Sequence, residues 1–240
     1  MTNWLPGAER VPTAAYGYPD LAPGAMQAIA CMSHIMQGYQ STMIRWALER
    51  PFTTYKSAHF TIGRDGRVVQ HIGIRDAAWC AGGVRSPTWA LLPPGLNPNR
   101  CVVALEHEGF STVPNEYPYD YLYSANQPWP EPMVEASIAV QAWVHGELGL
   151  TPSVDTIIGH RETDSVTRAD DPGSAWPRGR IIAALAGEAP VELPPRLSPN
   201  AAATWVDFGN ALVGQNGRSL IPIRYDGGMA LYEYRIPRGG

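Results

Sequence analysis

The sequence contains few cysteines: Cys31, Cys80 and Cys101 are the only three among 240 residues. They are odd in number and lie far apart, which excludes the paired disulfide framework of a small secreted protein. A reduced, cytosolic origin fits this cysteine usage better. We therefore expect each of the three to be a small, buried, apolar side chain.

Long apolar runs and a signal sequence are also missing. No run reaches the roughly 20 residues that a membrane-spanning helix needs, so we expect no stable insertion into a membrane. The first ten residues include Trp4–Leu5–Pro6 and an acidic residue but no apolar signal core. We therefore expect the protein to be made in the cytoplasm without a signal peptide.

The chain has no excess of positive charge. It carries 18 Lys and Arg against 22 Asp and Glu, a formal net charge of −4, so we expect no nucleic acid as a partner. Proline (23) and glycine (24) are abundant, but so are Trp (8) and Tyr (11), which favours long ordered loops over disorder.

Residues 57–70 carry the clearest local pattern in the sequence. Apolar and polar residues alternate on both sides of Asp65–Gly66, which predicts a β-hairpin. His59 and Thr61 share one face of its first strand. Because a single hairpin is only marginally stable, it requires further strands or a covering helix.

The remaining elements are predicted from apolar runs, helix-capping residues and helix-breaking residues. The near-continuous apolar run 101–106 predicts a strand that is covered on both faces. We expect further extended segments at 28–34, 72–83 and 156–160, although the run 28–34 is short enough to leave a helix open as well. We expect helices at 41–49 (with Ser41 as N-cap), 131–148 (ended by Gly149) and 177–187. Residues 1–22 are expected to be irregular.

The character of the chain changes near its end. Residues 1–188 are expected to form the main domain and residues 189–199 a stiff, Pro-rich linker. In 200–240, two turn dipeptides, Asn216–Gly217 and Asp226–Gly227, separate alternating runs and predict a three- or four-stranded meander. About forty residues bury little core alone, so this β module should pack on the main domain or on a second copy.

Three residues have the types and positions of metal ligands. His34 and His160 each end a predicted strand, and Asp171 lies in the loop that follows His160. Zinc in hydrolytic sites commonly takes three His and carboxylate ligands and leaves a fourth position for water. The same ligand set also suits non-haem Fe(II), so ligand type alone leaves both metals open.

Glu106 ends the buried run 101–106. Apolar surroundings disfavour the charged form of a carboxylate, which would raise its pKa toward that of a useful general base. Glu108 lies two residues further on and shares the same face, so the pattern alone does not rank the two.

Five blocks in a fixed order resemble a known family. They are Ser57–Ala–His–Phe with Arg64–Asp–Gly and Val69–Gln; Ala78–Trp79–Cys–Ala–Gly82; Val103–Ala–Leu–Glu106–His–Glu–Gly109; Gly159–His160–Arg–Glu; and Asp171–Pro–Gly with Ala175–Trp–Pro. With these blocks, residues 25–187 resemble the zinc N-acetylmuramoyl-L-alanine amidases, the type-2 amidase family related to the peptidoglycan recognition proteins. The resemblance implies an α/β fold, a central mixed β-sheet flanked by helices.

The resemblance also implies roles for individual residues. It makes His34, His160 and Asp171 the ligands of Zn²⁺. It makes Glu106, rather than Glu108, the general base. It further implies that Arg168 helps to hold the oxyanion. We also expect Trp79 and His59 to contact the substrate, beside the aromatic loop 110–130.

Three positions depart from the family pattern. Cys80 stands where the family's Trp-His-Ala-Gly block has its histidine. Ala169 stands where a basic residue usually precedes the ligand aspartate by two positions, so Arg168 would serve from one position earlier. Asp170 as the ligand would restore that spacing, but Asp171 begins the Asp-Pro-Gly block and is therefore preferred.

The implied reaction is metal-assisted hydrolysis of the amide that joins the lactyl group of N-acetylmuramic acid to L-alanine, in peptidoglycan or muropeptides. An endolysin that acts on the cell wall, with the β module for wall binding, assembly or capping, is the preferred role. Two alternatives stay open: a non-catalytic peptidoglycan-binding protein, and a cytoplasmic amidase that recycles muropeptides.

Overall fold

The computed structural model describes residues 2–12, 22–49, 56–111 and 125–187, together with the three strands of a C-terminal sheet. The chain divides into two compact units, residues 1–194 and residues 195–240. Most of the aromatic loop 110–130 and all of the expected linker 189–199 lie outside the described residues.

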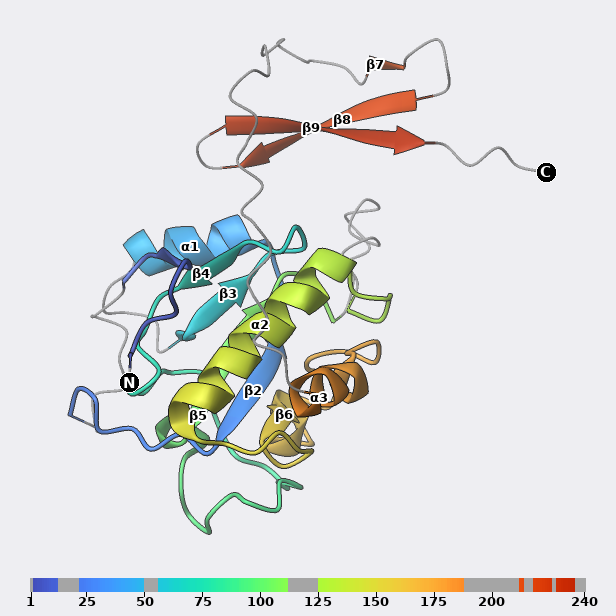
Figure 1. Ribbon diagram of the computed structural model, residues 1–240. Coiled ribbons are helices and arrows are strands. Elements are labelled where there is room, and N and C mark those ends of the chain that lie inside the picture. Colours follow the sequence, from blue (N-terminus) through green and yellow to red (C-terminus); the bar gives the residue numbers. More distant parts are fainter. Residues whose placement is uncertain are drawn as a thin grey trace. The chain divides into compact units, whose positions relative to one another are not determined.

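The first unit is built on a six-stranded sheet in the order β1–β4–β3–β5–β2–β6 (Figure 1). Only β3 and β4 pair antiparallel, and all other neighbours are parallel. This is the mixed sheet that was expected, with the predicted hairpin as its antiparallel part. The strands are β1 (Glu9–Arg10), β2 (Ala30–Ile35), β3 (Phe60–Ile62), β4 (Val68–Gln70), β5 (Val102–His107) and β6 (Ile157–Gly159).

Three α-helices flank this sheet, α1 (Gln40–Glu49), α2 (Glu131–Leu148) and α3 (Arg178–Ala186). Figure 1 shows α2 lying across the sheet with α3 beside it. The helix predicted over 131–148 is confirmed, and Gly149 ends it in the left-handed region (φ 67°), donating its N–H to the carbonyl of His145. Glycine reaches this conformation without the steric cost that a Cβ imposes.

Both faces of the sheet are buried, because alternate residues of each strand pack into different clusters. On the α2 face the cluster includes Cys31, Ile35, Phe60, Val103, Leu105, Ile157, Met133 and Val140. On the opposite face it includes Ala30, Met32, Val102, Ile158, Ala81 and Trp89. The prediction that residues 101–106 form a strand covered on both faces is therefore confirmed. All three cysteines are free thiols; Cys31 and Cys101 are buried and Cys80 is partly exposed.

Three local predictions were wrong. Residues 72–83 form no strand but a loop, which turns where Asp76 N–H donates to the Gly73 carbonyl and again at Gly82 (φ 59°). The helix predicted to start after Ser41 begins at Gln40. The N-terminal segment, expected to be irregular, contributes the short strand β1, which pairs with β4 and is fastened by an ion pair between Glu9 and Arg67 at 2.9 Å.

The early start of α1 has a physical cause. The carbonyl of Tyr39 accepts the first helical N–H groups, from Thr42 and Met43. Gln40 is buried, and its side chain donates hydrogen bonds to the carbonyls of Thr61 and Arg67. This tertiary anchor outweighs the capping preference of Ser41.

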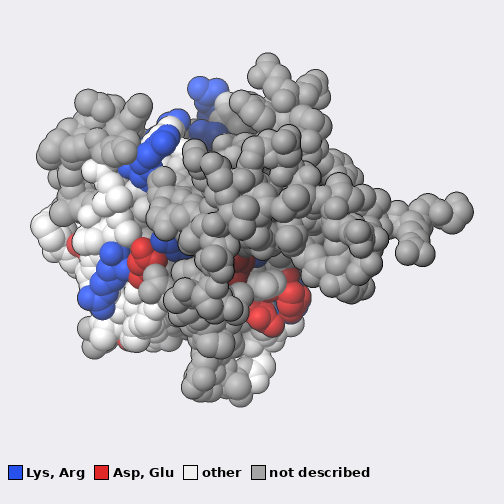
Figure 2. Space-filling view, turned by 90° about the horizontal axis from the view of Figure 1, so that it is seen from above, with Lys and Arg blue, Asp and Glu red and all other residues white. Residues whose placement is uncertain are grey.

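The second unit contains a three-stranded antiparallel sheet of β7 (Leu212–Val213), β8 (Arg218–Tyr225) and β9 (Gly228–Arg235). It confirms the predicted meander. Over the described part of the chain, no helix combines the length and the apolarity that crossing a bilayer requires. Seen from above, basic and acidic side chains both occur on the described surface (Figure 2), in keeping with the small net charge.

Candidate active site

The candidate residues meet in one row at the carboxyl ends of parallel strands. The register pairs His34 of β2 with Glu106 of β5, and Glu106 in turn with Thr61 of β3. On the other side, Ser33 pairs with Gly159 of β6, which brings the next residue, His160, beside His34. The ends of parallel strands are a common place for ligand sites in α/β sheets.

Asp171 joins this row from a loop that folds back on itself. The Asp171 N–H donates to the carbonyl of Arg168 at 3.0 Å, and the Asp171 carbonyl accepts the N–H of Arg161 at 3.1 Å. The Ile35 N–H donates to Asp171 Oδ1 at 2.7 Å, which ties the loop to the end of β2. Asp171 is thereby buried, whereas its neighbour Asp170 is exposed.

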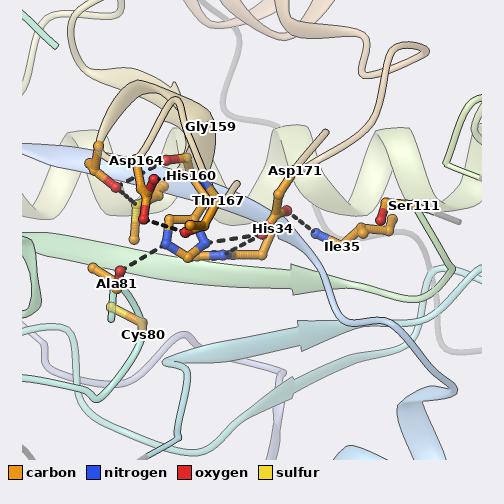
Figure 3. A network of polar contacts seen from close by, with 12 residues as sticks. His34, Ile35, Cys80, Ala81, Ser111, Gly159, His160, Asp164, Thr167 and Asp171 are labelled. Atoms are coloured by element: carbon orange, nitrogen blue, oxygen red, sulfur yellow. Dashed lines mark hydrogen bonds and ion pairs between the residues drawn. The ribbon is translucent and has the colours of Figure 1, made fainter. Parts of the chain in front are cut away.

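His34, His160 and Asp171 converge on a single point (Figure 3). Asp171 Oδ2 lies 3.3 Å from Nδ1 of His34 and 3.0 Å from Nδ1 of His160. The two rings meet edge to face, with their centroids 4.5 Å apart. Each of the three residues offers a ligand atom, and these atoms all lie within 4.8 Å of one another. Of the predicted pair of aspartates, it is therefore Asp171 that reaches the histidines.

The hydrogen bonds of this cluster fit a cation. A carbonyl only accepts, so the 2.8 Å contact between His160 Nε2 and the Ala81 carbonyl places a proton on Nε2. In the neutral ring, Nδ1 is then an acceptor that faces another acceptor, the Asp171 carboxylate. His34 Nε2 is buried with no hydrogen-bond partner among the described residues. Two imidazoles and one carboxylate around a shared point form a donor set that suits Zn²⁺.

The charge states of the ligands support this assignment. Burial lowers the pKa of His34, as does the nearby His160, so the ring is held neutral, as a metal ligand must be. Burial alone would raise the pKa of Asp171. The close contacts with His160 and His34 outweigh this effect and hold the pKa of Asp171 well below the usual range, so the carboxylate stays ionised.

Glu106 lies next to this cluster without being part of it. Its Oε2 is buried and has no hydrogen-bond partner among the described residues. Burial first, and then the negative charge of Asp171, raises the pKa of Glu106 to about 8, while Arg168 and Lys56 act in the opposite direction. A carboxylate that titrates near neutrality and keeps one oxygen without a partner in the described part of the chain has the properties of a general base.

Glu108 is used differently. One of its carboxylate oxygens accepts the N–H of Gln40 at 3.2 Å, and the other accepts the N–H of Arg64 at 2.9 Å. It therefore fixes the start of α1 and the turn of the hairpin. The sequence pattern alone did not distinguish this role from that of Glu106.

Arg168 and Trp79 lie near the site in different ways. Arg168 is exposed on the loop between His160 and Asp171, and its charge acts on both His34 and Glu106. Trp79 is half-buried, and its backbone exchanges hydrogen bonds with Ser57: its N–H donates to Ser57 Oγ, and its carbonyl accepts the Ser57 N–H.

His59 is placed inside the fold. It is completely buried; its Nδ1 accepts the N–H of Ala104 at 3.0 Å, and its Nε2–H donates to the carbonyl of Asp76 at 2.8 Å. Burial lowers the pKa of His59 to about 4. A neutral ring with both nitrogens occupied holds β3, β5 and the 72–83 loop together, and this placement gives no support to the predicted substrate contact.

Several groups that shape the site were not found from the sequence. They are the carbonyl of Ala81, the N–H of Ile35 and the side chain of His107, whose Nδ1–H donates to the His34 carbonyl at 3.0 Å. Backbone groups leave no signal in a sequence. His107 adjoins Glu106 but faces the α2 side of the sheet, where its Nε2 lies 2.9 Å from Ser137 Oγ.

With this geometry in place, the comparison with protein families is decisive. Residues 25–174, more than half of the chain, match the family model Amidase_2, described as N-acetylmuramoyl-L-alanine amidase. The chain belongs to this amidase family. The match spans all four residues of the candidate site and ends just beyond Asp171, and it confirms the family to which the sequence motifs pointed. No curated protein matches the chain.

Solved structures of amidases share the fold. A selenomethionine derivative of AmpD matches with a TM-score of 0.54 and 20% identity, covering 77% of this chain and 97% of AmpD. The endolysin amidase LysCS from Clostridium intestinale matches with a TM-score of 0.50 and 14% identity, over 76% of this chain and 97% of that one. The amidase AmiD from E. coli, in complex with a muropeptide substrate, matches with a TM-score of 0.50 and 15% identity, covering 70% of this chain and 60% of AmiD.

Proposed function

We propose that this member of the amidase family is a zinc-dependent hydrolase that cuts the amide between the lactyl group of N-acetylmuramic acid and L-alanine. One observation carries the proposal. His34, His160 and Asp171 converge on one point, and Glu106, whose Oε2 has no hydrogen-bond partner among the described residues, lies beside them in the same row of the sheet. A site that served only to bind peptidoglycan would not need this combination.

His34, His160 and Asp171 would hold the zinc ion. When bound, zinc supplies a Lewis acid that polarises the substrate carbonyl and lowers the pKa of water toward neutrality. The ionised Asp171 contributes the one negative charge of the set, and the Ala81 carbonyl holds His160 in the tautomer that leaves Nδ1 free.

Glu106 moves the protons. Its unpaired oxygen accepts a proton from the attacking water and then returns it to the leaving amine of L-alanine. A carboxylate with a pKa near 8 holds that proton readily after accepting it, which suits the second step. Arg168, whose charge reaches the same region, stabilises the negative oxygen that develops on the scissile carbonyl.

The substrate is peptidoglycan or its muropeptide fragments. The substrate in the AmiD complex, anhydro-N-acetylmuramic acid-L-Ala-D-gamma-Glu-L-Lys, contains the bond in question and supports this choice. Trp79, half-buried on the segment that leads to Ala81, is our candidate for a side chain that contacts the substrate.

We propose an endolysin as the biological role. The separate second unit, residues 195–240, supports it, because an added β module suits binding to the wall or assembly. Muropeptide recycling in the cytoplasm is the competing role, and it would require that the second unit has no part in wall binding.

Two assays test the proposal. Dye release from purified cell walls should occur with the zinc-loaded protein and stop when a chelator removes the metal; binding to walls without release would instead identify a non-catalytic binding protein. Intact sacculi and soluble anhydro-muropeptide should then be compared. Cleavage confined to the soluble fragment would exclude the endolysin role.

A further inference from the structure

Asn99 is a buried polar side chain that lies outside the metal cluster. Only 1% of it is exposed. Its Oδ1 accepts the backbone N–H of Ala81 at 2.7 Å and that of Cys80 at 2.9 Å, and the Cys80 thiol makes a weak contact with it at 3.6 Å. One side-chain oxygen therefore fixes two successive peptide groups.

Ala81 connects this oxygen to the site. Its carbonyl accepts the Nε2–H of His160 at 2.8 Å, and Figure 3 shows it below the ring, opposite Asp171. On its other side Ala81 is followed by Gly82 and Gly83. Gly82 has φ 59°, and a Cβ at either glycine would meet nothing within 4 Å. The two glycines offer no side chain that could hold Ala81, whereas Asn99 accepts the N–H groups of both Cys80 and Ala81.

Asn99 is itself presented by a short, well-fixed turn. It is the middle residue of the 3₁₀ helix η2 (Pro98–Arg100), whose first residue is a proline. Asn97 caps this turn, with its Oδ1 accepting the N–H of Asn99 at 2.9 Å. The turn leads directly into β5, so the position of Asn99 is tied to the sheet.

We propose that Asn99 is a positioning residue for the metal site. By holding residues 80 and 81, it aims the Ala81 carbonyl at His160 Nε2, which fixes the tautomer and the orientation of the ring and turns Nδ1 toward Asp171. Outer partners of metal-bound histidines act in this way. The inference rests on the proposed zinc function.

Zinc affinity, measured by competition with a chromogenic chelator, tests the proposal. Asn99→Ala should weaken zinc binding by about 10- to 100-fold. Asn99→Asp keeps an acceptor at the same place and should stay within the same order of magnitude as the wild type. Asn97→Ala is the matched control, because it removes a side-chain acceptor from the same turn without touching residues 80 and 81. It should bind zinc like the wild type.

A second measurement does not depend on metal. In the zinc-free protein, ¹⁵N NMR should show His160 protonated at Nε2 in the wild type and in Asn99→Asp, and a mixture of tautomers in Asn99→Ala. If Asn99→Ala does not fold, Asn99→Thr replaces it, since its oxygen stands one bond closer to the backbone and does not reach both N–H groups.

The outcomes separate the two proposals. Unchanged affinity and an unchanged tautomer in Asn99→Ala would overturn the role of Asn99, and so would an equal loss of affinity in Asn97→Ala, which would indicate general loosening of the turn. If the wild type itself binds no stoichiometric zinc, the zinc function fails, while the tautomer comparison still decides whether Asn99 positions His160.

Discussion

His34 and Glu106 are directly paired residues in the parallel ladder of β2 and β5. Paired side chains in neighbouring strands lie on the same face of a sheet, roughly 5 Å apart. A proposed metal ligand and the proposed general base are therefore held side by side by backbone hydrogen bonds, not by a loop. Their separation is a property of the sheet itself.

We predict that Glu106→Gln loses catalytic turnover but keeps its zinc. The amide keeps the shape of the side chain but accepts no proton, so turnover should fall by about 10²- to 10⁴-fold. Zinc content should be unchanged, because Glu106 is not among the converging ligands. Metal analysis and dye release on the same preparation measure both; near-wild-type turnover would remove Glu106 from the mechanism.

Substitutions of the neighbouring residues Asp171 and Asp170 form a matched pair of variants that tests which aspartate binds the metal. Asp171→Asn removes the one charged ligand but keeps an oxygen for the Ile35 N–H, so the loop should remain folded. Its zinc affinity should fall by at least the roughly 10- to 100-fold that loss of an outer partner costs. Asp170→Asn changes an exposed side chain and should bind zinc normally. The reverse ranking in a chelator competition would reassign the ligand to Asp170.

Arg168 is expected to act on the transition state. Removing one group that stabilises an oxyanion costs about 10²- to 10³-fold in kcat; because Arg168 is exposed, we expect Arg168→Gln to lie at or below the lower end of that range. Arg168→Lys keeps the charge and should recover part of the loss. A rise in KM with unchanged kcat would show instead that Arg168 only binds the substrate.

Gly159 and Gly179 should respond in opposite ways to alanine. A Cβ at Gly159 would lie 2.6 Å from Pro172 Cδ and 3.3 Å from the Trp176 ring, so Gly159→Ala should destabilise the unit by about 1–3 kcal/mol. Gly179 lies in α3 with open space around it, and Gly179→Ala should stabilise by about 0.4–1 kcal/mol. Denaturant unfolding measures both, and equal effects would contradict the packing described at Gly159.

His59 should make the fold sensitive to acid. Its pKa in the folded protein is about 4, below the usual 6.5, because the ring is buried. Between these values the unfolded chain binds the proton and the folded chain does not, so stability falls as the pH drops through this window. One such group contributes at most about 1.4 kcal/mol per pH unit to the slope of the unfolding free energy against pH.

His71 and His107 titrate in the same way, each with a pKa lowered to about 4. The slope of the unfolding free energy against pH in the wild type is therefore the sum of the contributions of these histidines and His59. His59→Gln should lower the slope of unfolding free energy against pH by one proton's share, whatever its effect on stability at neutral pH. Urea titrations at several pH values between 4 and 7 give both slopes. Parallel lines for the two proteins would show that His59 is not held neutral.

Much of the fold was predictable because its signals are local. The turn at Asp65–Gly66, the buried run that became β5 and the stop at Gly149 are each set by neighbouring residues, and each was confirmed. The segment 72–83 was not, since its apolar residues pack as a loop whose hydrogen bonds go to distant partners such as Ser57 and Asn99.

The site, like the fold, was predictable from the sequence only in part. Residue types and motif order pointed to His34, His160 and Asp171, which the structure brings together. The sequence pattern did not rank Glu106 and Glu108. The structure distinguishes them by their partners: Glu108 accepts two backbone N–H groups, whereas Glu106 Oε2 has no partner among the described residues. The burial of His59 depends on Asp76 and Ala104, which lie far away in the sequence.

His34 and Asp171 are 137 residues apart along the chain, yet the cation would sit between them. A nascent or truncated polypeptide that has not yet reached Asp171 possesses only part of the chelating set. Occupancy of the centre would thus require the chain to be complete as far as Asp171. If an ion is bound, its binding free energy would stabilise the folded arrangement of β2, β6 and the loop that carries Asp171, because only that arrangement brings the three ligands together.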